Sequence, residues 1–477
     1  MPDSSTIAEL SALLLLWLFG YALDDCRRRM LPGFDRNVAA ALVLAVVIFA
    51  AKLAALPFFP GYPDDVHAWE RWSATMASHG PHAIYEPPAP ADYPPAYLYA
   101  LWAAGAAARS LVTTVAGLRL FVETPPLIAD LVLSLLIFAA IFHYWRNHAL
   151  ALAAMLLFAL NPALLYDSVV WGQADAVLVL PIALAALLLT QSRFVLGWAI
   201  AAVAALVKPQ ALLVLPVFAL WTMLNSGWRT WLWCAGTFLV TALVGFAPFL
   251  SGHPWYWPLS VYTFSAGRYR LASMNAFNLM AVLGGLDRPE FVSFMGVSYL
   301  ALGTVLLAAL YGLLAWLMWR KPRAPMVLIA TFLALLGFFV LAARVHERYL
   351  YPALALLTLL VFDAPAAMAV YIVLSATLLT NLIWVKRFHQ GVAALDPHSA
   401  AVMGISLLNV AAFAIASFWG AVASTPAGTL SKRWPSAVRW FFGSRKPALD
   451  EATAGSAAEG RGEAPRKVRR KSARRRH

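Results

Sequence analysis

The sequence predicts an all-α protein that crosses a membrane many times, and two observations carry this prediction. Of the 477 residues, 62% are apolar and 12% are charged, whereas a soluble domain has roughly half apolar and about a quarter charged residues. The apolar residues form long runs almost free of charge, which is typical of membrane-spanning helices. Lipid offers no hydrogen-bond partners to the backbone, so these runs are expected to be helical. This composition excludes a disordered chain, a collagen and a disulfide-linked scaffold.

The apolar runs yield about thirteen candidate spans. Several hold fewer than about 18 residues, so some boundaries are misplaced or some helices are broken. The apolar stretch 94–112 is placed as an interfacial or re-entrant helix, because a span there would move Arg320 and Arg323 to the outside. The candidate spans are 7–23, 37–59, 126–144, 149–166, 174–190, 194–207, 209–224, 231–250, 292–318, 325–342, 349–362, 365–384 and 399–419.

Basic residues predict the orientation. The runs 27–29 and 320–323 mark cytoplasmic loops, where Lys and Arg gather. Residues 431–477 hold 14 of the 36 Lys and Arg and four of the 23 Asp and Glu, so they carry +10 of the net charge of +13. Such a charged run is typical of a disordered tail that binds anionic surfaces nonspecifically, and it does not indicate nucleic acid. With this tail in the cytoplasm, an odd number of spans places the N-terminus outside.

The chain is expected to have three parts. Residues 1–36 form an additional N-terminal span and its cytoplasmic loop. Residues 37–420 form the transmembrane domain, whose long outside loops are 60–125 and 251–291. Residues 421–477 form the basic and disordered cytoplasmic tail, which is rich in Ala, Gly, Ser, Lys and Arg.

Acidic and aromatic residues gather in the first outside loop. Asp64 and Asp65 follow a predicted span, and two adjacent carboxylates at a membrane surface can act as a general base or as metal ligands. Trp69 and Trp72 follow at helical spacing, which predicts a helix lying in the interface. The alternative interpretation is a helix N-cap followed by an aromatic belt.

A second acidic segment returns to the same side of the membrane. Asp92 and Tyr93 precede Pro94 and Pro95, and tandem prolines are typical of a helix start. The role of ending one segment and starting a helix is enough to explain the two prolines. Asp92 is a third acid on the side of the first two.

Polar residues also interrupt the apolar runs further along. Gln173 and Asp175 lie on a short outside turn, where Asp175 either serves a site or stabilises the start of the next helix through its dipole. Lys208 and Gln210 flank a proline within the apolar stretch 194–224. An ionisable residue at membrane depth is a functional candidate, and a lysine that extends to the interface is the alternative.

Arg344, His346 and Arg348 lie within five residues of one another, between two spans on the predicted outside. Positive charge is disfavoured there, and a bound anion would explain it because the guanidinium fork matches phosphate oxygens. A loop network of Arg with Glu is the alternative. Asn275 and Asn278, in the second outside loop, would suit sugar hydroxyls or would serve as turn and capping residues.

Together these segments indicate sugar transfer from a lipid-linked phosphate donor. A carboxylate can deprotonate the acceptor hydroxyl, cations can stabilise the leaving phosphate, and Trp and Tyr rings can stack on sugars. The rival class is a transporter or lipid flippase, in which broken helices also hold charged residues near the midplane. That class predicts an inverted repeat, and the sequence shows none.

The chain resembles the GT-C-fold glycosyltransferases that use polyprenyl-phosphate sugars. It is most similar to the asparagine-linked-glycosylation glucosyltransferases and their bacterial, mannosyltransferase-like relatives, over roughly residues 40–385. Asp65 and Trp72 have the spacing of that family's first outside loop, and Tyr93-Pro94-Pro95 matches its Tyr-Pro-Pro segment. The resemblance extends to the family's two later basic motifs, which are matched by Lys208-Pro209-Gln210 and by Arg344-Val345-His346-Glu347-Arg348, where Arg replaces the first His and the Lys of the family's His-x-His-Glu-Lys.

The resemblance implies a GT-C-like bundle and an inverting transfer of a hexose, with mannose as the first candidate, to an acceptor hydroxyl on the outer, periplasmic face. It implies a lipid or glycan acceptor, surrounding membrane lipids, no cofactor, no metal and a bacterial inner-membrane location. Asp65 is the expected base, with Asp64 as the alternative. Four residues would hold the donor phosphate: Lys208, Arg344, His346 and Arg348. Nine would bind the substrates: Trp69, Trp72, Asp92, Tyr93, Gln173, Asp175, Gln210, Asn275 and Asn278.

Overall fold

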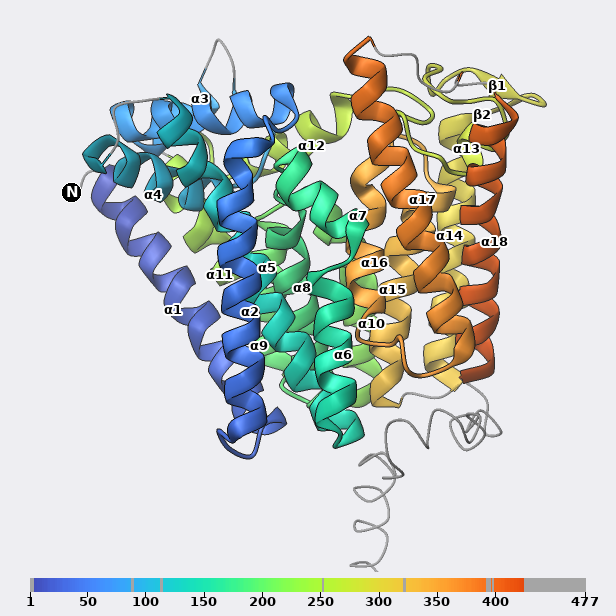
Figure 1. Cartoon of the computed structure of the whole chain (residues 1–477), viewed down its shortest axis with the longest axis horizontal. Coiled ribbons are helices and arrows are strands. Elements are labelled where there is room, and N and C mark those ends of the chain that lie inside the picture. Colours follow the sequence, from blue (N-terminus) through green and yellow to red (C-terminus); the bar gives the residue numbers. More distant parts are fainter. Residues whose placement is uncertain are drawn as a thin grey trace, which may run out of the picture.

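The computed structural model describes residues 4–86, 90–111, 115–250, 253–320, 323–391, 396 and 399–423. These residues form an all-α bundle, and their only sheet is a short antiparallel hairpin of β1 (Ser293–Phe294) and β2 (Val297–Ser298). The predicted tail beyond residue 423 lies outside the described residues. An all-α protein with many apolar helices is therefore what the sequence predicted and what the structure has (Figure 1).

Among the described residues, seven helices are long and apolar enough to cross a membrane. An eighth span results if α6 (His148–Ala159) is counted together with α7 (Pro162–Leu165) and the π-helical η3 (Tyr166–Trp171), which are bent by 43° against it. The seven helices are α1 (Ser4–Met30), α2 (Arg36–Ala55), α5 (Val115–Trp145), α11 (Trp228–Phe246), α14 (Tyr299–Arg320), α17 (Pro365–His389) and α18 (Ala400–Ala423).

The predicted count of about thirteen spans is not confirmed. Four apolar helices are shorter than a span, and the predicted span 349–362 is divided between η6 (Glu347–Leu350), α16 (Tyr351–Leu357) and a turn. Almost every residue of α8 is buried in protein, so its hydropathy reflects the bundle core and not a lipid-facing surface. The four shorter helical segments are α8 (Asp175–Thr190), α9 (Phe194–Ala205), η4 (Pro209–Val214) with α10 (Leu215–Asn225), and α15 (Ala324–Leu341).

The helix predicted to lie in the interface is α3 (Pro63–His79), which packs on α4 (Pro95–Leu111) at one end of the bundle (Figure 1). Pro63 begins α3, and acidic residues in its first turn favour the start of a helix. The hydroxyl of Ser73 donates to the carbonyl of Leu101 at 2.8 Å. A Cβ at Gly105 would lie 2.5 Å from Ser73 Oγ, so only glycine permits this close approach of α4.

The N-terminal end of α1 lies at the same end of the bundle as α3, together with η2 (Pro81–Tyr85), α12 (Pro258–Gly267) and the β-hairpin (Figure 1). The basic C-terminal turn of α1 and the end of α14 lie at the opposite end. The remaining short elements are η1 (Leu56–Phe58), η5 (Ala247–Phe249) and α13 (Leu279–Val282). The end of the bundle with α3 is referred to below as the α3 end.

A buried ion pair joins α2 to α5. Lys52 of α2 contacts Asp130 of α5 with an Nζ–Oδ2 distance of 3.0 Å, and both side chains are nearly inaccessible. Tyr351 of α16 donates to the other oxygen of Asp130 at 3.0 Å. Because buried charges are tolerated only when they are paired and hydrogen-bonded, this contact fixes how the three helices pack.

Candidate functional site

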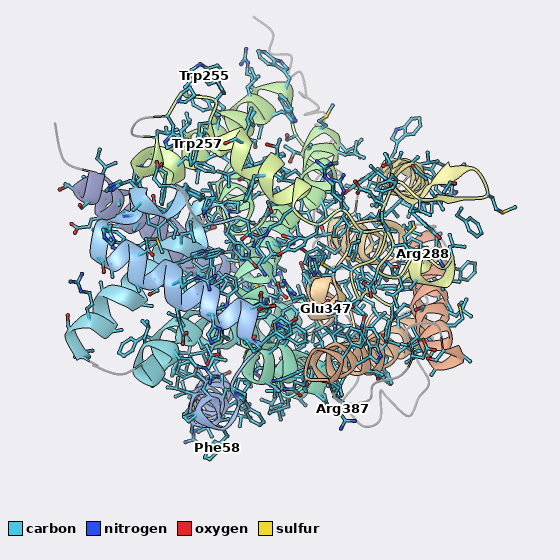
Figure 2. The ribbon with its side chains drawn as sticks, turned by 90° about the horizontal axis from the view of Figure 1, so that it is seen from above. Phe58, Trp255, Trp257, Arg288, Glu347 and Arg387 are labelled. Carbon is cyan, nitrogen blue, oxygen red and sulfur yellow. The ribbon has the colours of Figure 1, made fainter. Side chains whose placement is uncertain are left out.

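A cavity of ≈ 660 Å³ opens among polar side chains of α3, of the segments before α4 and after α12, and of η6. In the view from above, Glu347 of η6 lies near the middle of the molecule, whereas Phe58, Trp255 and Arg387 lie towards its rim (Figure 2). Eight of the fifteen predicted site residues line the cavity: Asp64, Asp65, Trp69, Trp72, Asp92, Tyr93, Gln210 and Arg348.

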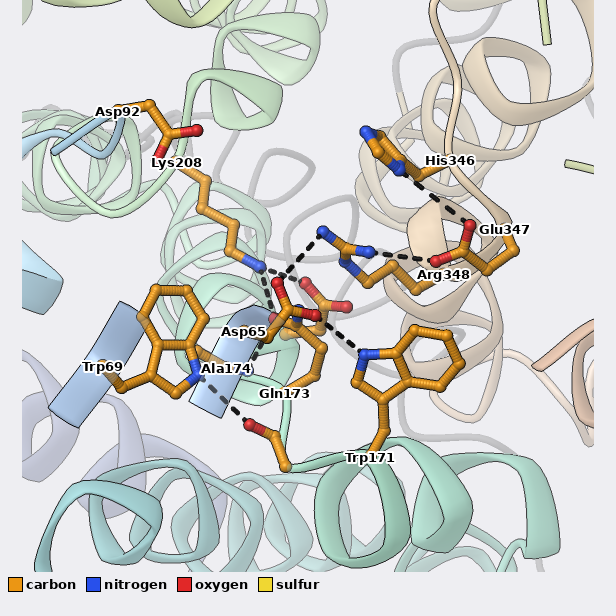
Figure 3. A network of polar contacts seen from close by, with 12 residues as sticks. Asp65, Trp69, Asp92, Trp171, Gln173, Ala174, Lys208, His346, Glu347 and Arg348 are labelled. Atoms are coloured by element: carbon orange, nitrogen blue, oxygen red, sulfur yellow. Dashed lines mark hydrogen bonds and ion pairs between the residues drawn. The ribbon is translucent and has the colours of Figure 1, made fainter. Parts of the chain in front are cut away.

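Asp65 lies at the centre of a network of polar contacts (Figure 3). Its Oδ2 atom accepts two hydrogen bonds, one from Trp171 Nε1 at 2.8 Å and one from Gln173 Nε2 at 2.7 Å. Its Oδ1 atom lies 3.8 Å from Arg348 Nη2. A carboxylate that lines a cavity, is held from behind by two donors and faces a guanidinium in front is suited to act on a bound hydroxyl.

The backbone explains how Asp65 reaches this position. The amide of Tyr62 donates to the carbonyl of Trp171 at 2.7 Å, and the two rings are stacked with 4.4 Å between their centroids. Gly172 has φ of +81°, and a Cβ there would lie 2.6 Å from Glu123 Oε1. Glycine at this position therefore lets the chain turn so that Trp171 and Gln173 both point at Asp65.

Lys208 and Asp175 form a buried pair behind the cavity wall. The Nζ–Oδ1 distance is 2.5 Å, and the side chains are 2% and 3% exposed. Lys208 Nζ also lies 3.4 Å from Gln173 Oε1 and 5.2 Å from the centre of the Tyr93 ring, which itself lines the cavity. The predicted segments around Gln173, Asp175 and Lys208 are thus brought together with Asp65, although these three residues do not line the cavity.

Arg348 joins the Asp65 network to the segment of η6. Its Nη1 atom contacts Glu347 Oε1 at 2.9 Å, and His346 Nδ1 lies 3.9 Å from the other oxygen of Glu347. Burial lowers the pKa of His346 well below its usual value, and Arg348 and Lys208 add to this effect. Burial also raises the pKa of Glu347, against the opposing effect of Arg348. His346 is therefore neutral at physiological pH and lies beside the site, in edge contact with Tyr269.

Aromatic rings form one wall of the cavity. Trp69 is 2% exposed and contacts Trp72 and Tyr93 edge to face, each with 5.2 Å between ring centroids. The indole of Trp69 donates to the carbonyl of Gly172 at 3.3 Å. Trp69 thus holds α3 against the turn that positions Asp65, and Trp72 and Tyr93 present ring surface to the cavity.

Asp92 and Arg268 form a further ion pair on the cavity lining, with an Oδ2–Nη1 distance of 2.8 Å. Burial raises the pKa of Asp92, and Arg268 opposes that rise. Arg268 therefore supplies a guanidinium to the cavity in addition to those of Arg71 and Arg348.

Three further predicted residues do not line the cavity. Arg344 donates to the carboxylate of Glu290 from Nε and from Nη2, with Nη2–Oε1 at 2.7 Å, and it donates from Nη1 to the carbonyl of Ala266. Asn278 caps α13 and donates to the carbonyl of Phe339 at 3.1 Å. The backbone of Asn275 has φ of +57°. These contacts agree with the alternatives of a loop ion pair for Arg344 and of capping and turn roles for the asparagines.

Sequence reasoning did not assign four residues of this region to the site. Glu347 lies within the predicted basic motif 344–348, Arg268 lies in the predicted outside loop 251–291, and Trp171 lies two residues before Gln173, so these positions were an available signal. Asp167 is fully buried, and neither of its carboxylate oxygens has a hydrogen-bond partner among the described residues. The only sequence feature that could have pointed to Asp167 is its position as an acidic residue at the end of an apolar run.

Within the described ranges, no three His, Cys, Asp or Glu side chains are grouped in a way that could hold a metal ion. The polar chemistry of the cavity is that of carboxylates, guanidinium groups and aromatic rings. The chain matches no known protein family, and it is not significantly similar to any curated protein.

Proposed function

We propose that this protein is an integral membrane glycosyltransferase that moves a hexose from a polyprenyl-phosphate donor to an acceptor hydroxyl. The observation that carries the proposal is the placement of Asp65 and Arg348 on one cavity, with 3.8 Å between their nearest charged atoms. This transfer needs a base for the acceptor and a cation for the leaving phosphate in the same space.

The reaction assigns a role to each group. The acceptor oxygen forms a bond to the anomeric carbon of the sugar, the bond from that carbon to the phosphate oxygen breaks, and Asp65 takes the acceptor proton. Arg348 and Arg268 stabilise the polyprenyl phosphate that leaves, because guanidinium groups bind phosphate oxygens in a bidentate manner. Arg348 exchanges its contact with Asp65 for the phosphate when the donor binds.

The rest of the cavity supports a sugar as the transferred group. Its volume of ≈ 660 Å³ falls within the range of about 300–1,000 Å³ that is usual for small-molecule sites. Trp72, Tyr93, Tyr269 and Tyr349 offer ring faces or edges to it. A polyprenyl chain would remain in the bilayer beside the bundle.

The proposed setting is a bacterial inner membrane with the α3 end at the outer face. The basic last turn of α1 and Arg320 of α14 lie at the opposite end, where positive charge favours the cytoplasm. In this orientation the N-terminus lies outside, and the donor enters from the outer leaflet.

Transfer from a panel of short-chain polyprenyl-phosphate hexoses to added acceptors tests the proposal. The purified full chain is expected to release polyprenyl phosphate, and Asp65→Asn is expected to lower that rate by about a thousandfold, because removing a general base costs about 10²–10⁴ in rate. Asp64→Asn is the matched control and should keep most of the activity. Full activity of Asp65→Asn would exclude this residue as the base, and a loss confined to Asp64→Asn would move the role to its neighbour.

A transporter or flippase is the second candidate, and the bent segment from α6 to η3 favours it. Asp167 of η3 is buried with its carboxylate oxygens unpartnered, as in discontinuous helices that carry charge near the midplane. In liposomes, movement of a fluorescent polyprenyl phosphate between leaflets without release of sugar would support this candidate over glycosyl transfer.

A further inference from the structure

The contacts of Asp65 determine which of its two oxygens faces the cavity. A carboxylate can accept about four hydrogen bonds, yet both Trp171 Nε1 and Gln173 Nε2 donate to Oδ2. The other oxygen, Oδ1, is the one nearest Arg348. Oδ1 is therefore the atom available to a proton on a bound substrate.

The amide of Gln173 can serve this purpose in only one orientation. Its Oε1 atom accepts from the backbone amide of Ala174 at 3.0 Å and lies 3.4 Å from Lys208 Nζ. Both of those groups are donors only. A flipped amide would place its NH₂ group against two donors and its oxygen against the Asp65 carboxylate, so Lys208 and Ala174 hold the Gln173 NH₂ group on Asp65.

Lys208 is held in turn by its own surroundings. It is 2% exposed, its ammonium contacts Asp175 at 2.5 Å, and the ring of Tyr93 lies beside it. Pro209 follows it and favours an extended backbone at Lys208, which has φ of −148° and ψ of +148°. The break between α9 and η4 thus turns the lysine inward toward Gln173, and the side chain does not reach the cavity lining.

We infer that Lys208 is a positioning residue for Asp65 and not a ligand of the donor phosphate. Lys208 fixes the Gln173 amide, the amide and Trp171 hold Oδ2, and Oδ1 faces the substrate. This inference rests on the proposed function for its catalytic meaning, but the geometry it describes can be measured without any reaction.

Two variants and one matched control test the inference on the purified full chain. Lys208→Met combined with Asp175→Asn removes both charges of the pair, so that Asp175 is not left as a buried carboxylate without its partner. Gln173→Met removes the amide directly. Lys52→Met combined with Asp130→Asn is the control, because it neutralises another buried Lys–Asp pair that does not touch Asp65.

The first measurement is the rate at which a water-soluble carbodiimide and an amine nucleophile modify Asp65, followed by mass spectrometry. Freeing Oδ2 is expected to raise this rate by about threefold or more in both test variants, because one hydrogen bond changes an equilibrium by several-fold. The control is expected to keep the rate of the unmodified protein. An unchanged rate in both test variants, or an equal rise in the control, would overturn the inference.

The second measurement separates positioning from phosphate binding. The test variants are expected to bind short-chain polyprenyl phosphate with a Kd within about twofold of the parent, while kcat falls by about tenfold and its acid limb moves in pH. A Kd raised about tenfold with unchanged Asp65 labelling would make Lys208 a phosphate ligand instead. If the parent transfers no sugar from any donor, the proposed function fails, and the labelling comparison alone decides the positioning role.

Discussion

Trp171 donates a hydrogen bond from its indole Nε1 to Oδ2 of Asp65 at 2.8 Å, although 106 positions separate the two residues in the chain. The turn after η3 and the start of α3 are joined at this point by a backbone hydrogen bond and a ring stack as well. The candidate base is thus held by a part of the chain that is distant in sequence, and its geometry depends on that contact.

Replacing this indole tests the contact. Trp171→Phe keeps a ring against Tyr62 but removes the donor, so kcat is expected to fall by about tenfold with little change in substrate affinity. Trp198→Phe is the matched control, because it removes a buried indole bond to Thr222 that lies elsewhere in the bundle. Steady-state kinetics of both variants check the prediction, and equal losses would show a general effect of removing a buried indole bond.

Arg348 and Arg344 are expected to differ in their effect on the donor. Arg348→Ala removes a guanidinium that lines the cavity, so the Kd for polyprenyl phosphate should rise by about tenfold or more. Arg344→Ala breaks a loop ion pair with Glu290 and should leave this Kd within about twofold. Fluorescence titration of the lipid phosphate measures both values, and a reversed order would place the anion site at Arg344.

The state of His346 predicts a pH dependence of stability. Burial first, and then Arg348 and Lys208, lower the pKa of His346 in the fold, whereas the unfolded chain titrates near pH 6.5. Below about pH 6.5 the unfolded state takes up a proton that the folded state does not, so stability is lost as the pH falls, by up to about 1.4 kcal/mol per pH unit.

His346→Gln is expected to remove this part of the pH dependence. The apparent Tm of the parent minus that of the variant, measured from about pH 8 to about pH 5, should decrease toward the acidic end, because only the parent loses stability through His346. Glu347 titrates in both proteins, so the difference between the two curves isolates His346. Parallel curves would show that His346 does not remain neutral in the fold.

Gly172 is expected to be sensitive to a single added carbon. A Cβ there would meet Glu123 Oε1 at 2.6 Å and Val66 Cγ2 at 3.0 Å, with φ at +81°. Gly172→Ala should therefore destabilise the protein by about 1–3 kcal/mol and lower activity through Asp65. Gly236→Ala in α11, where nothing lies within 4 Å, should instead be neutral or stabilise by up to about 1 kcal/mol. Thermal unfolding in detergent measures both changes.

Part of the site followed from the sequence because its chemistry is local. Asp64 and Asp65 directly follow an apolar run, and Arg348 lies between two others. Charged residues at such positions are costly in a membrane protein, so the sequence alone marks them as functional candidates. The structure brings Asp65 and Arg348 onto one cavity. Arg268 could be assigned to the site only from the structure, because its ion-pair partner Asp92 is distant in the sequence.

The sequence by itself determined that this is an all-α protein with many apolar helices, because hydropathy along the chain is a local property. It could not determine the number of spans, because α8 is apolar for contact with protein and not with lipid. Only the tertiary structure decided that Lys208 contacts Gln173 and Asp175. It also decided that Arg344 forms an ion pair with Glu290 and that Oδ1 of Asp65 faces Arg348. A charged side chain takes its role from the partners that burial imposes on it, and those partners are distant in sequence.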